Sequence, residues 1–321
     1  MLKMKPLLSC AAALGLVGSI AAGAATQAMA EFPENTIRIV VPWRAGGGTD
    51  SIARALATPM EELAGQSVLV ENVTGGAGNA GMLAVKNADA DGYTMVLNGS
   101  SDITAPIVFR DAPFSLDDYT CVGGVYDTPV WIVANKEQGF ETFADFVTAA
   151  KAAPGELTLG VTALNAPDDV FAKAITKAQG IDVRIIPFDG GAPLKKALIG
   201  NQVNAGVLIA PVMLGEVQGG IANVLVAGGS MKAITYEPLQ SLQTGADYGV
   251  TSDITLVRGV FLPKGVPADV AAKVEELVGK AAQSDSFVEF GKGFGFAPIW
   301  MPGEQYCDFM KQEDAVYRAM K

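Results

Sequence analysis

The stretch "VLVENVTGGAGNAGM", residues 68–82, runs from a β-rich segment directly into a glycine loop. The loop contains a literal G-x-G-x-x-G, formed by Gly76, Gly78 and Gly81. Glycine allows an anion to approach the backbone closely, and a helix that starts after such a loop presents N–H groups at its positive end. The stretch therefore predicts a strand, an anion-binding loop and a helix, with a dinucleotide or another anion as the ligand.

A second loop of the same kind lies one strand earlier, in "TIRIVVPWRAGGGTD", residues 36–50. Thr49 and Asp50 suit the cap or the first turn of the helix that follows. For either loop alone, an ordinary strand-to-helix turn is the simpler interpretation. Two such loops on successive strand–helix units would emerge at the same carboxyl edge of a parallel sheet, where α/β proteins bind ligands. The pair therefore favours a site that holds one anion from two sides.

A dinucleotide site fits this pattern less well. It normally needs one glycine loop on its first strand and an acidic residue near the end of its second strand. Here the strand after the second loop ends in "LNGSSD", and Asp102 lies beyond that strand. The chain also has no G-K-[ST] motif for a nucleoside triphosphate. A nucleotide-dependent oxidoreductase is thus kept as the alternative function, and we expect no cofactor.

The first thirty residues have the pattern of a secretory signal peptide. A basic start precedes a long apolar run, and residues 28–30 (A-M-A) form a cleavage site before Glu31. A lipoprotein signal at Cys10 is the alternative, but it would leave almost no apolar region ahead of the cysteine. No later apolar run approaches the ~18 residues of a membrane span, so we expect residues 31–321 to be exported to the periplasm.

The composition excludes several classes of function. The chain has no histidine, so Ser-His-Asp triads, Cys-His pairs and histidine metal sites are excluded, and we expect neither an enzyme nor a metal site. Its 23 basic and 34 acidic residues give a formal net charge of −11, which argues against nucleic acid and anionic membranes as partners. Beyond the signal peptide, Cys121 and Cys307 could form a disulfide, although two buried free thiols are the simpler interpretation.

Short β-rich runs alternate with helical stretches along residues 31–321, a length that suits two domains. Such alternation predicts an α/β fold with largely parallel sheets. The expected strands are 36–42, 67–72, 93–98, 130–135, 157–161, 183–188, 204–210, 223–227 and 254–262. The clearest helical stretches are 49–63, 141–153, 168–179, 267–283 and 302–320.

The motifs, in their order, resemble the substrate-binding proteins of tripartite tricarboxylate transporters, a family also called Bordetella uptake gene receptors. The resemblance is carried by "IRIVVPWRAGGGTDSIARALA" (37–57), "GQSVLVENVTGGAGNAGM" (65–82), "ADGYTMVL" (90–97), "FDGGAPLKKALIGNQVNAGVL" (188–208) and "RGVFLPKGVPADV" (258–270). It covers essentially all of residues 31–321.

The resemblance implies an α/β, two-domain periplasmic-binding-protein fold of type II-like form, each domain a mostly parallel sheet flanked by helices. Domain one would comprise 31–129 and 254–321, domain two 130–253, with the ligand cleft between them. It further implies a solute receptor that captures a di- or tricarboxylate, an aromatic carboxylate, or an acidic or hydroxy acid. The receptor would deliver this ligand to membrane permease subunits, and we expect it to be a monomer.

The resemblance also implies ligand contacts from both glycine loops, from the turn after the third strand, and from two turns of domain two. The residues are Arg44, Ala45, Gly46, Gly47, Thr49 and Asp50; Thr74, Gly75, Gly76, Ala77, Gly78 and Asn79; Ser100 and Ser101; and Thr162, Asp169, Phe188, Gly190, Gly191 and Ala192. Two alternatives stay open: the two serines could only cap a helix, and Phe188 could belong to the core.

Acidic residues depart from the family pattern. Asp168 and Asp169 stand where the family often has a histidine, and Asp189 stands where a basic or neutral polar residue commonly follows the aromatic. An acid that faces a bound carboxylate would repel it. Either these residues cap a helix or face solvent, or the ligand carries a hydroxyl or an ammonium group at one end.

Two arginines could supply positive charge. Arg44, in the first loop, is either a solvated surface residue or a cation that holds a second acidic group of the ligand. Arg258 is a weaker candidate of the same kind.

Overall fold

The computed structural model describes residues 32–228, 236–239, 241–250, 255–293 and 298–321. The predicted signal peptide, residues 1–30, lies outside the described residues. Residues Phe32–Lys321 form one compact unit. Within the described ranges, no helix combines the length and the apolar character needed to cross a membrane.

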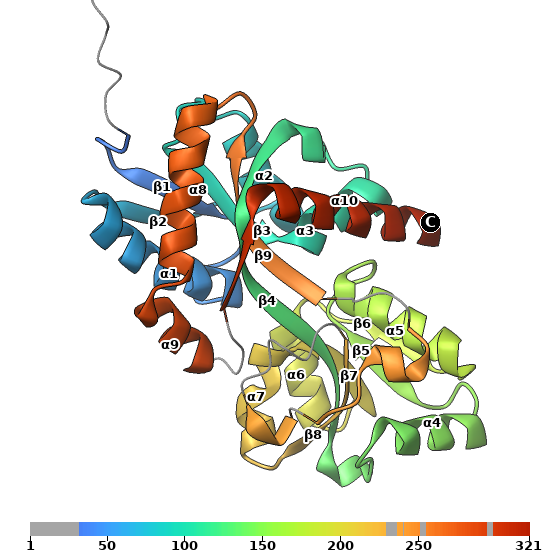
Figure 1. Ribbon diagram of the computed structural model, residues 1–321. Helices are drawn as coiled ribbons and strands as arrows, with labels where there is room; N and C mark the ends of the chain where they lie inside the picture. The colour runs from blue at the N-terminus through green and yellow to red at the C-terminus, as the bar shows by residue number, and fades with distance from the viewer. Residues whose placement is uncertain (1–31, 229–235, 240, 251–254, 294–297) are drawn as a thin grey trace, which may run out of the picture. The chain divides into compact units, whose positions relative to one another are not determined.

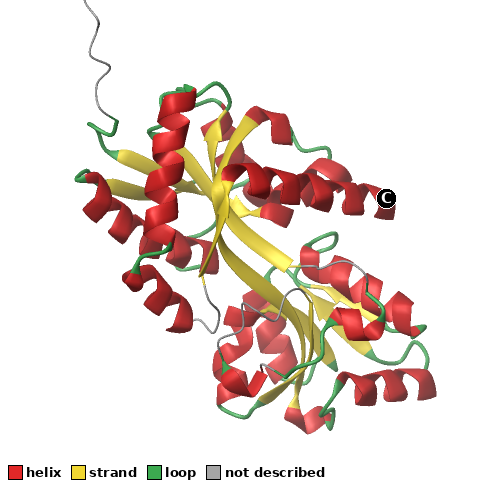
Figure 2. Cartoon of the chain, in the orientation of Figure 1, coloured by secondary structure: helices red, strands yellow, loops and turns green. Residues whose placement is uncertain are grey.

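A mixed β-sheet forms the centre of this unit, and helices cover it (Figures 1 and 2). Eight strands follow the order β2-β1-β3-β9-β4-β7-β5-β6, and β8 and β10 also pair with β4. The strands are β1 Ile37–Val41, β2 Val68–Asn72, β3 Thr94–Gly99, β4 Tyr119–Asn135, β5 Thr158–Val161, β6 Arg184–Pro187, β7 Ala205–Ile209, β8 Ala222–Gly228, β9 Thr255–Pro263 and β10 Pro298–Pro302.

The helices follow the strands in the α/β alternation that the sequence predicts. They are α1 Gly48–Ala64, α2 Asn79–Lys86, α3 Ser100–Phe109, α4 Phe143–Ala152, α5 Pro167–Gln179, α6 Gly191–Ile199, α7 Ala210–Gln218, α8 Ala268–Ala282, α9 Asp285–Gly293 and α10 Gly303–Met320. The 3₁₀ turns are η1 Gly76–Gly78, η2 Leu116–Asp118, η3 Lys136–Gln138, η5 Glu237–Leu239 and η6 Gly245–Tyr248.

The parallel pairing expected from the sequence occurs at both ends of the strand order. β1 is parallel to β2 and β3, and β5 is parallel to β6 and β7. The strands between these groups, β9 and β4, pair antiparallel with their neighbours. The fold class is thus the expected α/β class, with antiparallel strands added where the two parallel groups are joined.

The long strand β4 belongs to both groups. It pairs with β9 up to Pro129 and with β7 and β8 from Val130 onward. Figure 1 shows it running without a break from one group of strands to the other. Nearly all of its residues are buried, which agrees with the apolar run VWIVA near its end.

Helix α1 shows why the segments after the glycine loops become helices. Its buried side chains Ile52, Leu56 and Met60 recur every four residues and form one apolar face against the sheet. The helix ends at Gly65, whose φ of 63° is the left-handed conformation that glycine adopts readily, and whose N–H bonds to the Glu61 carbonyl. Local sequence therefore fixes the apolar face of α1 and the residue at which the helix ends.

Cys121 of β4 and Cys307 of α10 form a disulfide with a Cα–Cα distance of 5.8 Å. The sequence left open a disulfide or two free thiols, and the disulfide is what the structure contains. It joins residues 186 positions apart and holds α10 against the sheet.

Candidate functional site

The first glycine loop lies between β1 and α1 and is held by a carboxylate of its own helix. The Gly46 N–H donates to Asp50 Oδ2 at 2.8 Å, and Arg54 pairs with Asp50 Oδ1 at 2.9 Å. Burial raises the pKa of Asp50, but the bonds from Arg54, Gly46 and Asn72 outweigh it and hold the pKa below its usual value. The Asp50 carboxylate therefore braces the loop from inside.

The second glycine loop adopts a run of left-handed backbone conformations. Gly75, Gly76, Ala77 and Gly78 all have positive φ, with values from 53° to 141°. The N–H groups of Gly78 and Ala80 both donate to the Gly75 carbonyl. Three of the four left-handed positions are glycine, which explains the glycine-rich sequence.

The two loops lie side by side. Asn72, the last residue of β2, donates to the Trp43 carbonyl and to Asp50 Oδ1, each at 2.9 Å. A Cβ on Gly78 would stand 3.4 Å from Cζ2 of Trp43, so the second loop packs on an aromatic ring of the first. The Trp43 Nε1–H donates to Asn98 of β3 at 2.8 Å. The ends of three parallel strands are therefore tied together at one edge, as the sequence predicts.

Helices α1, α2 and α3 begin at this edge with no side-chain cap. Their N-cap residues are Gly47, Gly78 and Gly99, and none of these makes a side-chain cap hydrogen bond. Helix α4, away from this edge, is capped fully by Thr142 and Asp145. Uncapped helix starts leave first-turn N–H groups available to an anion.

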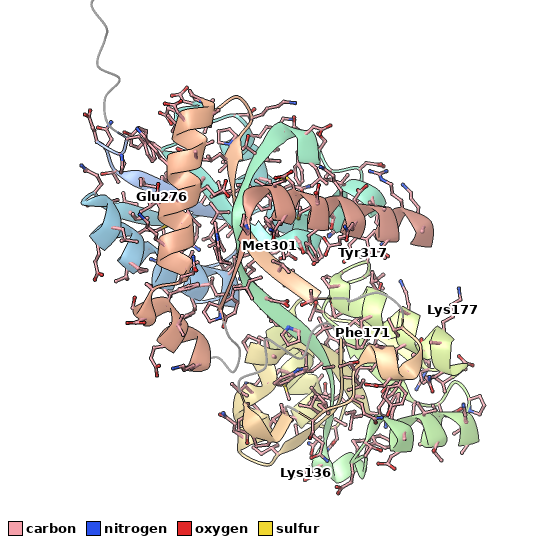
Figure 3. The ribbon with its side chains drawn as sticks, in the orientation of Figure 1. Lys136, Phe171, Lys177, Glu276, Met301 and Tyr317 are labelled. Carbon is pink, nitrogen blue, oxygen red and sulfur yellow. A yellow bond between two sulfur atoms is a disulfide. The ribbon has the colours of Figure 1, made fainter. Side chains whose placement is uncertain are left out.

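The turn after β3 carries the two candidate serines, and Ser100 is hydrogen-bonded to α10. The Ser100 hydroxyl donates to Oε1 of Glu313 at 3.0 Å, and Thr104 donates to Oε2 at 2.6 Å. Ser100 is fully buried, so its side chain is committed to Glu313 of α10. Ser101 is equally buried and lies near the Tyr317 phenol, which α10 also contributes (Figure 3).

Sequence reasoning missed Glu313. It lies more than 200 residues from its serine and threonine partners, inside an unremarkable amphipathic helix. Burial raises its pKa to about 8, so at neutral pH the side chain is mostly protonated. Nothing in the local sequence marks such a long-range partner.

The acidic residues after β5 accept hydrogen bonds from their own loop. Asp168 accepts from the Thr162 N–H and hydroxyl, while Asp169 accepts from the Asn165 N–H at 2.7 Å and pairs with Lys173 at 2.6 Å. Burial raises the pKa of Asp168 to about 6.

Neither aspartate is the N-cap that one interpretation of the sequence proposed. The N-cap of α5 is Ala166, and Asp168 and Asp169 lie in its first turn, with their carboxylates turned back onto the loop. Both carboxylates therefore make their hydrogen bonds within the loop and the first turns of their own helix.

The aromatic–glycine turn after β6 lies beside that loop. The Gly190 N–H donates to the Thr162 carbonyl at 3.0 Å, and a Cβ on Gly160 would stand 3.2 Å from the Phe188 ring. Phe188 is half-buried, Asp189 is exposed, and α6 starts after Gly190 with no side-chain cap. The candidate residues after β5 and β6 thus lie in a second group of neighbouring turns.

The two candidate arginines have opposite environments. Arg44 is exposed. Arg258 of β9 is only 4% exposed, and its guanidinium donates to Thr49 Oγ1 at 3.1 Å and Thr128 Oγ1 at 2.8 Å.

A cavity of about 530 Å³ lies elsewhere, between α3, α10 and the start of β4. Apolar side chains such as Ile103, Phe261 and Met310 line it together with the disulfide, and none of the predicted ligand residues does. Among the described residues, no cluster of three or more cysteine, aspartate or glutamate side chains could hold a metal ion.

Comparison with known proteins agrees with this architecture. The profile of the family described as tripartite tricarboxylate transporter family receptor matches residues 52–320. BugT of Bordetella pertussis is 28% identical over 309 residues, which cover 94% of this chain and 93% of BugT. An Agrobacterium vitis protein, the UPF0065 protein in the TAR-I ttuE-ttuC' intergenic region, is 26% identical over 275 residues, covering 85% and 79% of the two chains.

Solved structures share the fold. The periplasmic binding protein BugD superposes with a TM-score of 0.76 at 25% identity, over 90% of this chain and 97% of that one. R. palustris Rpa4515 with adipate gives a TM-score of 0.75 at 25% identity, over 90% and 95% of the two chains. Because the family profile spans most of its length, the chain belongs to the tripartite tricarboxylate transporter receptor family.

Proposed function

We propose that this protein is a periplasmic receptor that captures one small organic carboxylate at the two glycine loops and delivers it to permease subunits of a tripartite tricarboxylate transporter. The observation that carries the proposal is the edge where α1, α2 and α3 start uncapped beside one another. Backbone N–H groups and helix dipoles there favour a negative charge without any catalytic group.

The known relatives support a carboxylate as the ligand. The R. palustris protein at 25% identity was solved with adipate, and its chain is covered almost completely. The aspartates that argued against an anion, Asp168 and Asp169, are bonded within their own loop. The proposed site therefore needs no unusual ligand to offset them.

We further propose that the ligand lies between two lobes, residues 31–129 with 254–321 and residues 130–253. The change of β4 pairing partners between Pro129 and Val130 supports this division. In such a receptor only the closed form contacts the ligand from both lobes, so ligand shifts the population toward closure.

Thermal denaturation tests this function. The full chain, expressed with its leader and purified from the periplasm, would be heated with adipate, malate, citrate, glutamate or benzoate, and with NAD and glucose as controls. A ligand that binds only the native state raises the melting temperature. We expect at least one carboxylate to raise it, and NAD and glucose to leave it unchanged.

Stabilisation by NAD alone would replace this proposal with the dinucleotide-binding alternative. No stabilisation by any of the carboxylates would contradict the proposed ligand class. Intact-mass measurement of the same sample also tests the leader, since cleavage is expected to leave Glu31 as the first residue.

A further inference from the structure

Arg258 occupies an unusual position for a charged side chain. It lies in β9, paired with Gly99 of β3 on one side and Tyr126 of β4 on the other. This is the region where the two groups of strands are joined, and the residue is only 4% exposed. Arginine is rarely buried to this extent unless it is paired.

The hydrogen-bond partners of Arg258 are neutral. Its Nε donates to the hydroxyl of Thr49 and its Nη1 to the hydroxyl of Thr128. Among the described residues, no ion pair within 4.0 Å includes Arg258. A guanidinium carries five N–H donors and keeps its charge at every physiological pH. Within the part of the chain that the structure describes, hydroxyl groups therefore hold the buried charge, and no carboxylate lies within 4.0 Å of it.

Two acidic residues, Asp102 and Asp127, act on the Arg258 charge from beyond ion-pair distance. Burial lowers the pKa of Arg258, and the field of Asp102 is the largest effect that raises it again. Asp127 is also near, and its carboxylate accepts the Thr255 hydroxyl. A buried charge without a close counter-ion costs several kcal/mol, so a function is needed to explain it.

Thr49 connects Arg258 to the proposed site. It is the second residue of α1, directly after the uncapped glycine loop at Gly46 and Gly47. An anion on this helix start would lie near the Thr49 hydroxyl and within the field of the guanidinium behind it. The helix dipole and the buried cation act in the same direction at this point.

We propose that the Arg258 guanidinium, placed behind the first turn of α1 and bonded to Thr49, is the positive charge that makes the first glycine loop select an ionised carboxylate. This proposal rests on the proposed receptor function. It assigns charge selection to Arg258 and leaves exposed Arg44 a minor role, because water screens an exposed charge far more than a buried one.

Paired acid and amide probes test this assignment. Adipate, malate and benzoate would be titrated by calorimetry against adipamide, malamide and benzamide, which have similar shapes and no charge. The proteins would be the parent, R258Q, R258K and the control R44Q. We expect R258Q to weaken carboxylate binding about 10- to 100-fold, as for the loss of one charge-assisted interaction, and to leave amide binding unchanged.

R258K and R44Q separate charge from packing. R258K keeps the charge but loses the fixed fork of donors, so we expect it to retain part of the preference for acid over amide. R44Q should change that preference less than R258Q. Circular dichroism and melting curves without ligand would show that each variant is folded.

The outcomes distinguish this assignment from the receptor function itself. If the parent binds a carboxylate and folded R258Q keeps the full preference for acid over amide, Arg258 does not select the charge. Equal losses for acid and amide in both variants would assign Arg258 a packing role only. If the parent binds none of the three acids nor citrate or glutamate, the receptor proposal fails first.

Discussion

At the residue scale, the proposed carboxylate site depends on polar side chains that hydrogen-bond to the loop backbone. Asn72 and Asp50 link the first glycine loop to the end of β2 through hydrogen bonds. The family resemblance implied that Asp50 is a ligand residue, and its place after the glycine loop suited the cap or first turn of a helix. The sequence could not show that the carboxylate turns inward, because the Gly46 N–H and Asn72 meet it only in the folded chain.

Gly78 offers a test of the loop as an anion site. Its φ is +96°, and an added Cβ would stand 3.4 Å from the Trp43 ring. We expect Gly78→Asp to abolish carboxylate binding in calorimetric titration, because it adds both backbone strain and a negative charge at the loop. Gly78→Ala carries the strain without the charge and should bind more weakly than the parent but measurably.

Circular dichroism would confirm that both Gly78 variants fold. Parental affinity in folded Gly78→Asp would remove the second loop from the ligand site.

At the scale of elements, the strands were largely predictable and the helix partnerships were not. Each of the nine expected strand segments overlaps one observed strand, because alternating or continuous β-branched runs bounded by turns are a local signal. The sequence missed β10 and the first half of β4, whose prolines and glycines obscure that signal. The contact between α10 and α3 depends on residues more than 200 positions apart.

Glu313 gives that helix contact a pH signature. Its pKa of about 8 lies above the ordinary value of 4.5, so the native state holds a proton that the unfolded chain releases. The protonated Glu313 side chain therefore contributes its full stabilisation of the native state below pH 4.5, and this contribution is lost as the pH rises toward 8. Between these limits, the unfolding free energy of the parent should fall relative to that of Glu313→Gln by up to about 5 kcal/mol.

Urea unfolding at several pH values would measure this difference. Asp102 and Asp168, each with a pKa of about 6, titrate in both proteins, so only the difference between parent and variant reports Glu313. Parallel pH profiles for the two proteins would contradict the assignment.

The disulfide holds the same helix nearer its start, at Cys307. Because it closes a loop of 186 residues, Cys121→Ser with Cys307→Ser should lower the free energy of unfolding by about 3–5 kcal/mol. Denaturant titration of the oxidised parent and the double variant would measure it. Dithiothreitol should lower the free energy of unfolding of the parent and leave that of the double variant unchanged. An equal decrease in both proteins would contradict this explanation.

At the scale of the whole molecule, the family resemblance supplied what local patterns could not. Composition and periodicity predicted an α/β protein, while the proposed division into two lobes came from motifs shared with transporter receptors. The proposed boundary between the lobes lies inside the continuous, buried strand β4. No linker segment separates the lobes there, so local sequence patterns could not locate the boundary.

Closure of the two proposed lobes is open to direct measurement. A carboxylate that stabilises the protein should reduce its radius of gyration in small-angle scattering, because only a closed form surrounds the ligand. R258Q at the same ligand concentration is the matched control and should stay closer to the unliganded value. An unchanged radius at saturating ligand would argue against a hinge between the lobes.

Trp43 gives the molecule a built-in optical reporter. The chain has three tryptophans; Trp131 is fully buried in β4, and Trp300 packs against the glycines of β4 and α8. Trp43 alone of the three lies between the two glycine loops, with its ring on Gly78 and its N–H on Asn98. Any anion that settles there changes the polarity around one indole, so intrinsic fluorescence can follow binding in real time without a label. A Trp43→Phe variant should lose that emission change and leave the other two tryptophans as a constant background.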